Sequence, residues 1–203
     1  MKKLVTISRE YGSGGRIIGR LVAEKLGVPF YDKEIIDMAV EQSGMSRDLV
    51  ESAELRAKSS FSYSLSSAMN FGDGIMTEPV SVNEKLFITQ FHVITNIGES
   101  GEGVIVGRCA DYVLKDLPGV TNVFIHAETD DRIRRCIEKY GIDPDEAKET
   151  VRTYDKARAN NYNYNTCQKW GDYRNYNLSL NSSYMSEEEL ANLIVDYINK
   201  RTY

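Results

Sequence analysis

The segment "REYGSGGR", residues 9–16, gives the chain its strongest structural signal. It follows an apolar run, "LVTIS" (residues 4–8), which is typical of a short buried strand. It precedes "IIGRLVAEKL" (residues 17–26), where apolar residues recur at helical spacing until Gly27 ends the predicted helix. Glycines between a strand and a helix let backbone N–H groups approach an anion at the positive end of the helix. The pattern favours a phosphate-cradling turn over its alternative, an ordinary tight turn.

Beyond this turn, predicted strands and helices alternate along the chain. Four further apolar runs are predicted to be strands, at residues 28–31, 103–107, 120–127 and 176–182. Helices are predicted at residues 32–44, 46–58, 82–100, 128–141, 144–162 and 187–201. Several of the strands are continuous apolar runs, as expected for strands that are covered on both faces. We therefore predict an α/β fold, a parallel sheet flanked by helices, as a single domain over residues 1–203.

Local signals mark where three of these helices begin. Asp32 is placed as the N-cap of the second helix. Asp143 and Pro144 open the helix that follows residue 143. Ser186 precedes the last helix, and Glu189 stands at the offset of a capping box. These side chains can satisfy N–H groups that a helix leaves unpaired at its start.

Residues 59–79 are rich in serine and glycine and show no long periodicity. We expect them to form a mobile loop or a lid over the site. The alternative is a disordered surface loop.

Composition narrows the classes of function. Of 203 residues, 41% are hydrophobic and the net charge is −5, which argues against a broad nucleic-acid-binding surface. The cysteines Cys109, Cys136 and Cys167 are widely spaced and form no zinc or disulfide pattern. His92 and His126 are isolated, and no metal site is predicted. No apolar run has membrane-spanning length, so we expect a cytoplasmic protein without a membrane partner.

Four segments resemble one family of enzymes. "GSGGRIIGRLVAEKL" (residues 12–26) is similar to the start of cytidylate kinases, and "ISREYGSGGR" (residues 7–16) to the opening of the cytidylate kinase-like group. "FYDKEII" (residues 30–36) and "VIVGR" (residues 104–108) extend the resemblance. A distal arginine motif at residues 152–158 completes it. The resemblance implies a three-layer P-loop kinase fold with a helical lid, which we place at residues 141–175.

The same resemblance implies a phosphotransferase of the nucleoside-monophosphate kinase type that uses ATP and Mg²⁺. Cytidine monophosphate is its first candidate acceptor. Two alternatives stay open: a kinase for a different small-molecule phosphate acceptor, and a non-catalytic nucleotide-binding protein. The partners implied are a nucleotide and a small acceptor, and the residues predict no oligomeric state.

The phosphate-binding turn departs from the common P-loop, G-x-x-x-x-G-K-[ST]. Aligned through the following helix, Gly15 takes the place of the lysine and Ile17 that of the hydroxyl that binds Mg²⁺. The resemblance places the ATP phosphates on Arg9, Gly12, Ser13, Gly14, Gly15 and Arg16. We hypothesise that Arg16, with Arg9, replaces the charge of the lysine; the alternative is that both are surface arginines. Mg²⁺ then relies on Ser13, water, nucleotide oxygens or a distant carboxylate.

The remaining candidates come from the distal motif and the acceptor side. The resemblance assigns catalytic roles to Arg152 and Arg158, oriented by Asp155, with a salt-bridged helix face as the alternative. It assigns acceptor binding to Arg108 and Asp32. Asp37 and Met38 stand where the family pattern has tyrosine and arginine, which weakens the case for cytidine monophosphate. Four basic residues near these motifs are expected to be mostly solvated helix charges: Arg132, Arg134, Arg135 and Lys156.

Overall fold

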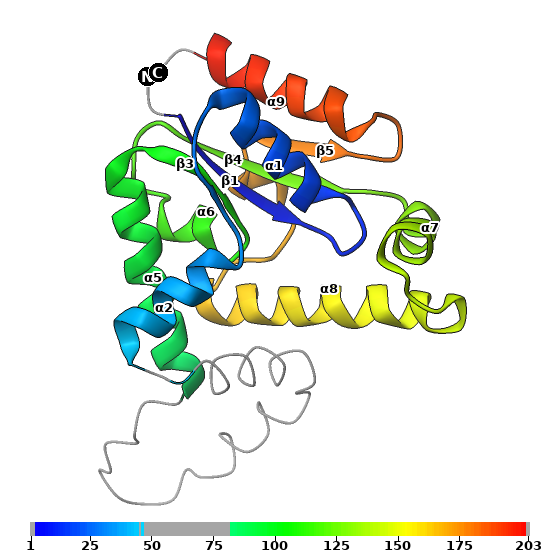
Figure 1. Ribbon diagram of the computed structural model, residues 1–203, viewed down its shortest axis with the longest axis horizontal. Coiled ribbons are helices and arrows are strands. Elements are labelled where there is room, and N and C mark those ends of the chain that lie inside the picture. The colour runs from blue at the N-terminus through cyan, green and yellow to red at the C-terminus, as the bar shows by residue number, and fades with distance from the viewer. Residues whose placement is uncertain (1–2, 45, 47–81, 202–203) are drawn as a thin grey trace, which may run out of the picture.

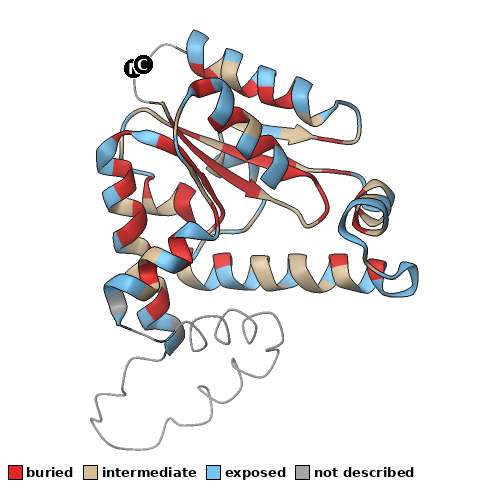
Figure 2. Ribbon diagram, in the orientation of Figure 1, coloured by how far each residue is buried: buried red, intermediate tan, exposed pale blue. Residues whose placement is uncertain are grey.

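The computed structural model describes residues 3–44, 46 and 82–201. Within these residues a five-stranded sheet has the order β2-β3-β1-β4-β5, and every neighbouring pair of strands is parallel (Figure 1). The strands are β1 (Lys3–Arg9), β2 (Phe30–Tyr31), β3 (Glu102–Val106), β4 (Val120–His126) and β5 (Leu178–Asn181). The parallel sheet predicted from the continuous apolar runs is confirmed, and Figure 2 shows how completely β1 and β3 are buried.

Helices cover both faces of this sheet. They are α1 (Gly15–Leu26), α2 (Glu34–Ser43), α5 (Val82–Ser100), α6 (Ala110–Val113), α7 (Thr129–Tyr140), α8 (Pro144–Thr166) and α9 (Glu187–Lys200), with a 3-10 helix at Tyr173–Asn175. Helices α1 and α9 lie side by side on one face, and α2, α5 and α6 pack on the other (Figure 1). None of the described helices is long and apolar enough to cross a membrane.

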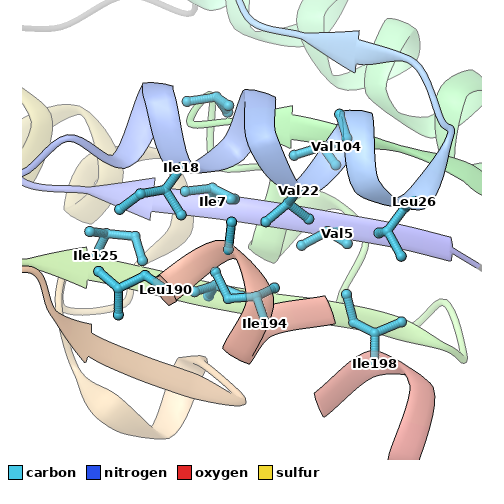
Figure 3. Close-up of a cluster of buried hydrophobic side chains, with 14 residues drawn as sticks. Val5, Ile7, Ile18, Val22, Leu26, Val104, Ile125, Leu190, Ile194 and Ile198 are labelled. Atoms are coloured by element: carbon cyan, nitrogen blue, oxygen red, sulfur yellow. The ribbon is translucent and has the colours of Figure 1, made fainter. Parts of the chain in front are cut away.

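The core between α1, α9 and the sheet fixes where α1 starts. Ile18 and Val22 of α1 meet Ile194 of α9 over Val5 and Ile7 of β1, all fully buried (Figure 3). Each large aliphatic side chain buried in this way contributes about 1.5–3 kcal/mol. The first turn of α1 is therefore held directly above the end of β1, and the segment that joins them has little freedom.

The opposite face depends on one close approach between helices. A Cβ added to Gly98 of α5 would lie 2.5 Å from Cδ2 of Leu114, which follows α6. Glycine therefore lets α5 pack close to the segment after β3.

The capping predictions have mixed outcomes. Asp143 accepts a hydrogen bond from the backbone N–H of Asp145 at 2.9 Å, with Pro144 in the first turn, and Ser186 forms the capping box with Glu189; both predictions are confirmed. The N-cap predicted at Asp32 is wrong, because α2 begins one residue later without a side-chain cap.

Two further predictions lie outside the described residues. These are the helix at residues 46–58, of which only residue 46 is described, and the loop at residues 59–79. The lid predicted at residues 141–175 contains α8 and the 3-10 helix, and its movement stays a prediction.

Candidate active site

The turn between β1 and α1 leads into the N-terminus of α1, and residues 12–15 are buried. Gly12 and Gly14 both have a left-handed backbone, with φ of 78°. A Cβ at Gly12 would lie 2.7 Å from the carbonyl oxygen of Arg132, so only glycine fits there. Gly14 is the N-cap of α1 and makes no side-chain cap hydrogen bond. Since the first N–H groups of a helix lack partners inside the helix, a phosphate can take the place of the cap.

Side chains from other elements hold the turn in this conformation. Arg135 of α7 donates a hydrogen bond from Nη1 to the carbonyl of Gly12 at 2.8 Å. The buried hydroxyl of Ser182, just after β5, donates to the carbonyl of Ser13 at 2.7 Å. Both carbonyls are therefore engaged from outside the turn, and its shape is fixed without a ligand.

The expectation that the arginines of α7 are mostly solvated is wrong for two of the three. Arg132 is only 8% exposed and pairs with Glu10 and Asp155. The side chain of Arg135 is 14% exposed. Arg134 matches the expectation, because its side chain is 64% exposed and pairs with a neighbour on its own helix. The helical pattern did not reveal which side of α7 faces the turn.

Asp32 lies at the centre of the site. It is buried, and its Oδ2 lies 2.6 Å from Nε of Arg16. Its Oδ1 lies 3.8 Å from Nη2 of Arg9. Its own N–H donates to Glu34 at 2.9 Å. The carboxylate predicted to cap α2 is instead an ion-pair partner for arginines from β1 and α1.

The guanidinium of Arg9 is perturbed by its surroundings. Its pKa is lowered from 12.5 to about 9, chiefly because burial disfavours the charged form. The positive charge of Arg158 adds to the effect, whereas Asp32 opposes it. Arg108 and Arg16 also lower this pKa. Arg9 therefore lies among like charges that a bound anion would relieve.

Arg108 follows β3 on a strained stretch of backbone. Gly107, Arg108 and Cys109 have successive positive φ values of 76°, 57° and 54°. Left-handed backbone at two consecutive non-glycine residues is costly, and such strain concentrates at functional sites. The pKa of Arg108 is lowered by burial, and the nearby Asp32 opposes this shift. Burial raises the pKa of the Cys109 thiol to about 12, so this thiol is protonated at neutral pH.

Helix α8 brings two members of the distal motif to the turn. Arg158 donates from Nη1 to the carbonyl of Arg9 at 3.0 Å, and its guanidinium lies 5.3 Å from the centre of the Tyr11 ring. Asp155 accepts a hydrogen bond from the Tyr11 N–H at 2.7 Å, and its other oxygen pairs with Arg132. The backbone on either side of residue 10 is thus attached to α8.

The third member of the motif, Arg152, is not brought to the site. Its side chain is 66% exposed and pairs with Glu149, one turn earlier on α8. Its Nε donates to the same carboxylate at 2.8 Å. The catalytic role predicted for Arg152 requires a movement of α8 and stays a prediction.

Together, Arg9, Arg16, Arg108 and Arg158 surround Asp32, and we call these five residues the arginine cluster. Asp32 pairs with Arg9 and Arg16 and acts on the charges of Arg108 and Arg158. The cluster lies beside the N-terminus of α1, where parallel strands end. Its excess of positive charge suits a ligand with several negative charges.

The cluster fits phosphate better than it fits a directly bound metal. Ile17, which matches the hydroxyl residue in the alignment to the start of cytidylate kinases, is 38% exposed and has no ligand atom. Ser13 is fully buried, and its hydroxyl donates to the carbonyl of Glu10 at 2.9 Å, so this side chain does not serve Mg²⁺. No group of three metal-ligating side chains occurs among the described residues. Asp32 is the carboxylate that the cluster offers to a metal.

A buried polar network beneath the cluster was not predicted. The carboxylate of Asp111 accepts a hydrogen bond from the hydroxyl of Tyr162 at 2.6 Å. Burial raises the pKa of Asp111, and this hydrogen bond opposes the shift. The hydrogen bond joins α6 to α8. Helical spacing gave no signal for it, because its members lie 51 residues apart.

Comparisons with known proteins agree with this arrangement. The model of a family described as cytidylate kinase-like matches residues 4–184. An uncharacterized protein from Eubacterium ventriosum ATCC 27560 has a TM-score of 0.72 and 27% identity, covering 98% of this chain and 100% of that one. No curated protein matches the chain.

Two solved kinases share the fold at lower identity. Shikimate kinase from Acinetobacter baumannii, in complex with shikimate, has a TM-score of 0.54 and 14% identity, covering 99% of this chain and 97% of that one. A gluconokinase from Sinorhizobium meliloti 1021 has a TM-score of 0.50 and 15% identity, with 98% and 93% covered. The three-layer P-loop kinase fold predicted from the sequence is confirmed.

Proposed function

The chain belongs to the cytidylate kinase-like family, and we propose that it is an ATP-dependent phosphotransferase acting on a small anionic acceptor. The observation that carries this proposal is the arginine cluster, placed beside the N-terminus of α1, which has no side-chain cap. Phosphoryl transfer is catalysed almost entirely by positioning and by positive charge around the phosphoryl oxygens. The cluster supplies both without a covalent intermediate.

The turn at residues 12–16 would hold the phosphates of ATP. When bound, ATP supplies the phosphoryl group, with Mg²⁺ carried mainly by nucleotide oxygens and water. The N–H groups at the start of α1 orient the phosphate tail, and Arg9 and Arg16 offset its charge. Ser182 and Arg135 keep the turn in shape while this happens.

A hollow of about 230 Å³ adjoins the phosphate turn, because Arg135 and Ser182 line it and also bind the carbonyls of the turn. Its lining consists of charged and hydroxyl side chains: Asp131, Arg134, Arg135, Glu138, Lys139, Ser182 and Ser183. Such a lining suits a ribose hydroxyl or a phosphate group of ATP, and it offers no apolar surface to a base.

The acceptor would lie on the other side of the cluster, at Asp32 and Arg108. Asp32 can accept a hydrogen bond from an acceptor hydroxyl, and Arg108 can pair with an acceptor phosphate or carboxylate. Family membership makes a nucleoside monophosphate the first acceptor to test, and cytidine monophosphate the first of these. The solved kinases named above act on shikimate and gluconate by their names, so small hydroxy acids form the second group.

Helix α8 would complete the site from the lid side. Arg158 already contacts the backbone of Arg9. Closing of the lid would bring Arg152 toward the transferred group and exclude water, which limits wasteful hydrolysis of ATP.

The test is ADP formation from ATP and Mg²⁺ with a panel of acceptors. The panel contains CMP, UMP, AMP, shikimate and gluconate, with a reaction lacking acceptor as the baseline. We expect one anionic acceptor to raise ADP formation at least about tenfold. Arg108→Gln should then raise the KM for that acceptor, while Arg174→Gln, an exposed arginine away from the cluster, should not. ATP binding without turnover on any acceptor would favour the non-catalytic alternative.

A further inference from the structure

We propose that the cation of the phosphate-binding turn has moved to the other end of the turn: Arg9 supplies the charge that the lysine of a common P-loop supplies. The inference rests on the proposed function, because it concerns how ATP is held. In G-x-x-x-x-G-K-[ST], the first position is glycine and the seventh is lysine. Here the first is Arg9 and the seventh is Gly15, so the two residue types are exchanged.

The exchange is forced by space at Gly15. A Cβ built on Gly15 would lie 2.6 Å from Cβ of Arg9 and 3.0 Å from its Cγ. It would also lie 3.3 Å from Cβ of Ile125 in β4. These distances are too short for carbon atoms, so the stem of Arg9 occupies the space into which a lysine at position 15 would start. The two positions compete for one channel, and only one of them can carry a long side chain.

A second glycine lies against the other end of the Arg9 side chain. A Cβ built on Gly107 would lie 2.0 Å from Nη1 of Arg9 and 3.1 Å from its Cζ. Gly107 also has a positive φ of 76°, which disfavours other residues. The side chain of Arg9 therefore runs from the start of α1 to the end of β3. Gly15 and Gly107 are positioning residues that make room for its stem and for its guanidinium.

The charges around Arg9 call for an anion. Its guanidinium lies among those of Arg158, Arg108 and Arg16, and its distance to Asp32 is 3.8 Å. Asp32 is held more closely by Arg16, at 2.6 Å. A cation that is buried beside like charges is unfavourable unless an anion joins it. Phosphate oxygens on the adjacent helix start would supply that anion.

This geometry separates Arg9 from Arg16. The Arg16 side chain is 49% exposed and pairs closely with Asp32, whereas that of Arg9 is 20% exposed. Arg16 is thus held mainly by Asp32, which leaves Arg9 as the cation with more of its charge available to the phosphates. The sequence had ranked Arg16 first, because it adjoins the lysine position.

A cycle of variants of the full chain tests the exchange. The variants are Arg9→Gly, Gly15→Lys and the double variant that carries both changes. Calorimetry in the presence of Mg²⁺ measures the ATP affinity of each variant and of wild type. Thermal melts without ligand measure their melting temperatures. We expect Arg9→Gly to lose ATP affinity about tenfold to a hundredfold, the range for losing one charge-assisted hydrogen bond. Gly15→Lys alone should melt lower, because its side chain collides with Arg9.

The double variant should recover the melting temperature and bring ATP affinity to within about threefold of wild type, since it restores the first glycine and the lysine of the common loop. Arg9→Gln keeps most of the side-chain stem and removes the charge, so it should lose affinity like Arg9→Gly even if that variant folds poorly. Arg174→Gln is the control with an exposed arginine.

Three results would overturn the inference. One is an Arg9→Gln variant that binds ATP like wild type while Arg16→Gln does not; the proposed function would then stand with Arg16 as its cation. The second is a double variant that binds ATP no better than Arg9→Gly, because the two positions would then not be equivalent. The third is a wild-type protein that gives no heat with ATP, which removes the proposed function together with the inference.

Discussion

Arg158 and Arg152 stand in one motif on one helix, yet they lie in different environments. Arg158 contacts the backbone of Arg9, and burial lowers its pKa. Arg152 points to solvent, and its pairing with Glu149 raises its pKa. The spacing of a motif fixes positions along a helix, but the packing of that helix decides which member reaches the site. We therefore expect that replacing Arg158 lowers both stability and activity. Replacing Arg152 should lower activity alone.

The largest effect is expected from Arg158→Ala. It removes a cation from the arginine cluster and the hydrogen bond to the carbonyl of Arg9. We expect ADP formation to fall about a hundredfold, the usual size for losing one preorganised donor. The melting temperature should fall by about 2–4 °C, corresponding to roughly 1 kcal/mol for one hydrogen bond. Steady-state kinetics and thermal melts measure both, with Arg174→Ala as the control, and an active variant would place Arg158 outside the site.

Asp155→Asn tests whether Asp155 holds the phosphate-binding turn in place in addition to pairing with Arg132. Asp155 accepts the N–H of Tyr11 and pairs with Arg132, whose side chain is 10% exposed. The amide keeps one acceptor but leaves Arg132 short of negative charge, which should cost about 2 kcal/mol, or roughly 4–8 °C in the melting temperature.

The matched control for this change is Asp196→Asn, an exposed aspartate paired with Lys200 on α9. It should move the melting temperature by less than about 1 °C. Equal shifts in the two variants would mean that Asp155 is an ordinary surface charge.

The fold could be predicted from the sequence, because its signals are local. Continuous apolar runs marked the parallel strands, and Ser186 with Glu189 marked the start of α9. The site was predicted less completely, because its contacts join residues far apart. No residue next to Asp32 in the sequence indicated that it would pair with Arg9 and Arg16 instead of capping α2.

The same reason explains what was missed. Arg132 and Arg135 lie on a helix whose polar pattern fits a solvated surface, and only the packing of α7 against the turn buries them. In the sequence, Gly107 indicated only the end of a strand. The side chain that lies against it belongs to Arg9, 98 residues earlier. Such requirements become visible only once β1 and β3 are paired.

Arg152→Ala tests whether the exposed arginine of the motif contributes to activity without contributing to stability. Because its pair with Glu149 is exposed, the melting temperature should stay within about 1 °C of wild type. If the lid closes as proposed, kcat should still fall about tenfold, since the arginine would act only in the closed state. An unchanged kcat would leave Arg152 as a surface charge and limit the functional motif to Asp155 and Arg158.

The smallest expected effect is on the pH dependence of the melting temperature. It distinguishes Arg9, inside the arginine cluster, from the exposed Arg152. The pKa of Arg9 in the folded chain is about 9, lowered from 12.5. A basic group with a lowered pKa opposes folding below its folded pKa, and this cost disappears as the pH rises from about 9 toward 12.5. Arg9→Gln removes the charge at every pH. The melting temperature of the variant relative to wild type should therefore fall by about 2–4 °C between pH 8 and pH 10.

Arg152→Gln provides the contrast, because the pKa of Arg152 is raised and the residue stays charged over this range. Its melting temperature relative to wild type should be the same at pH 8 and pH 10. Thermal melts of the three proteins in matched buffers give both differences, and groups common to all three cancel. A constant difference for Arg9→Gln would mean that Arg9 keeps its proton in the folded chain. Asp32 would then offset the positive charges around Arg9 more fully than its distance of 3.8 Å from the Arg9 guanidinium indicates.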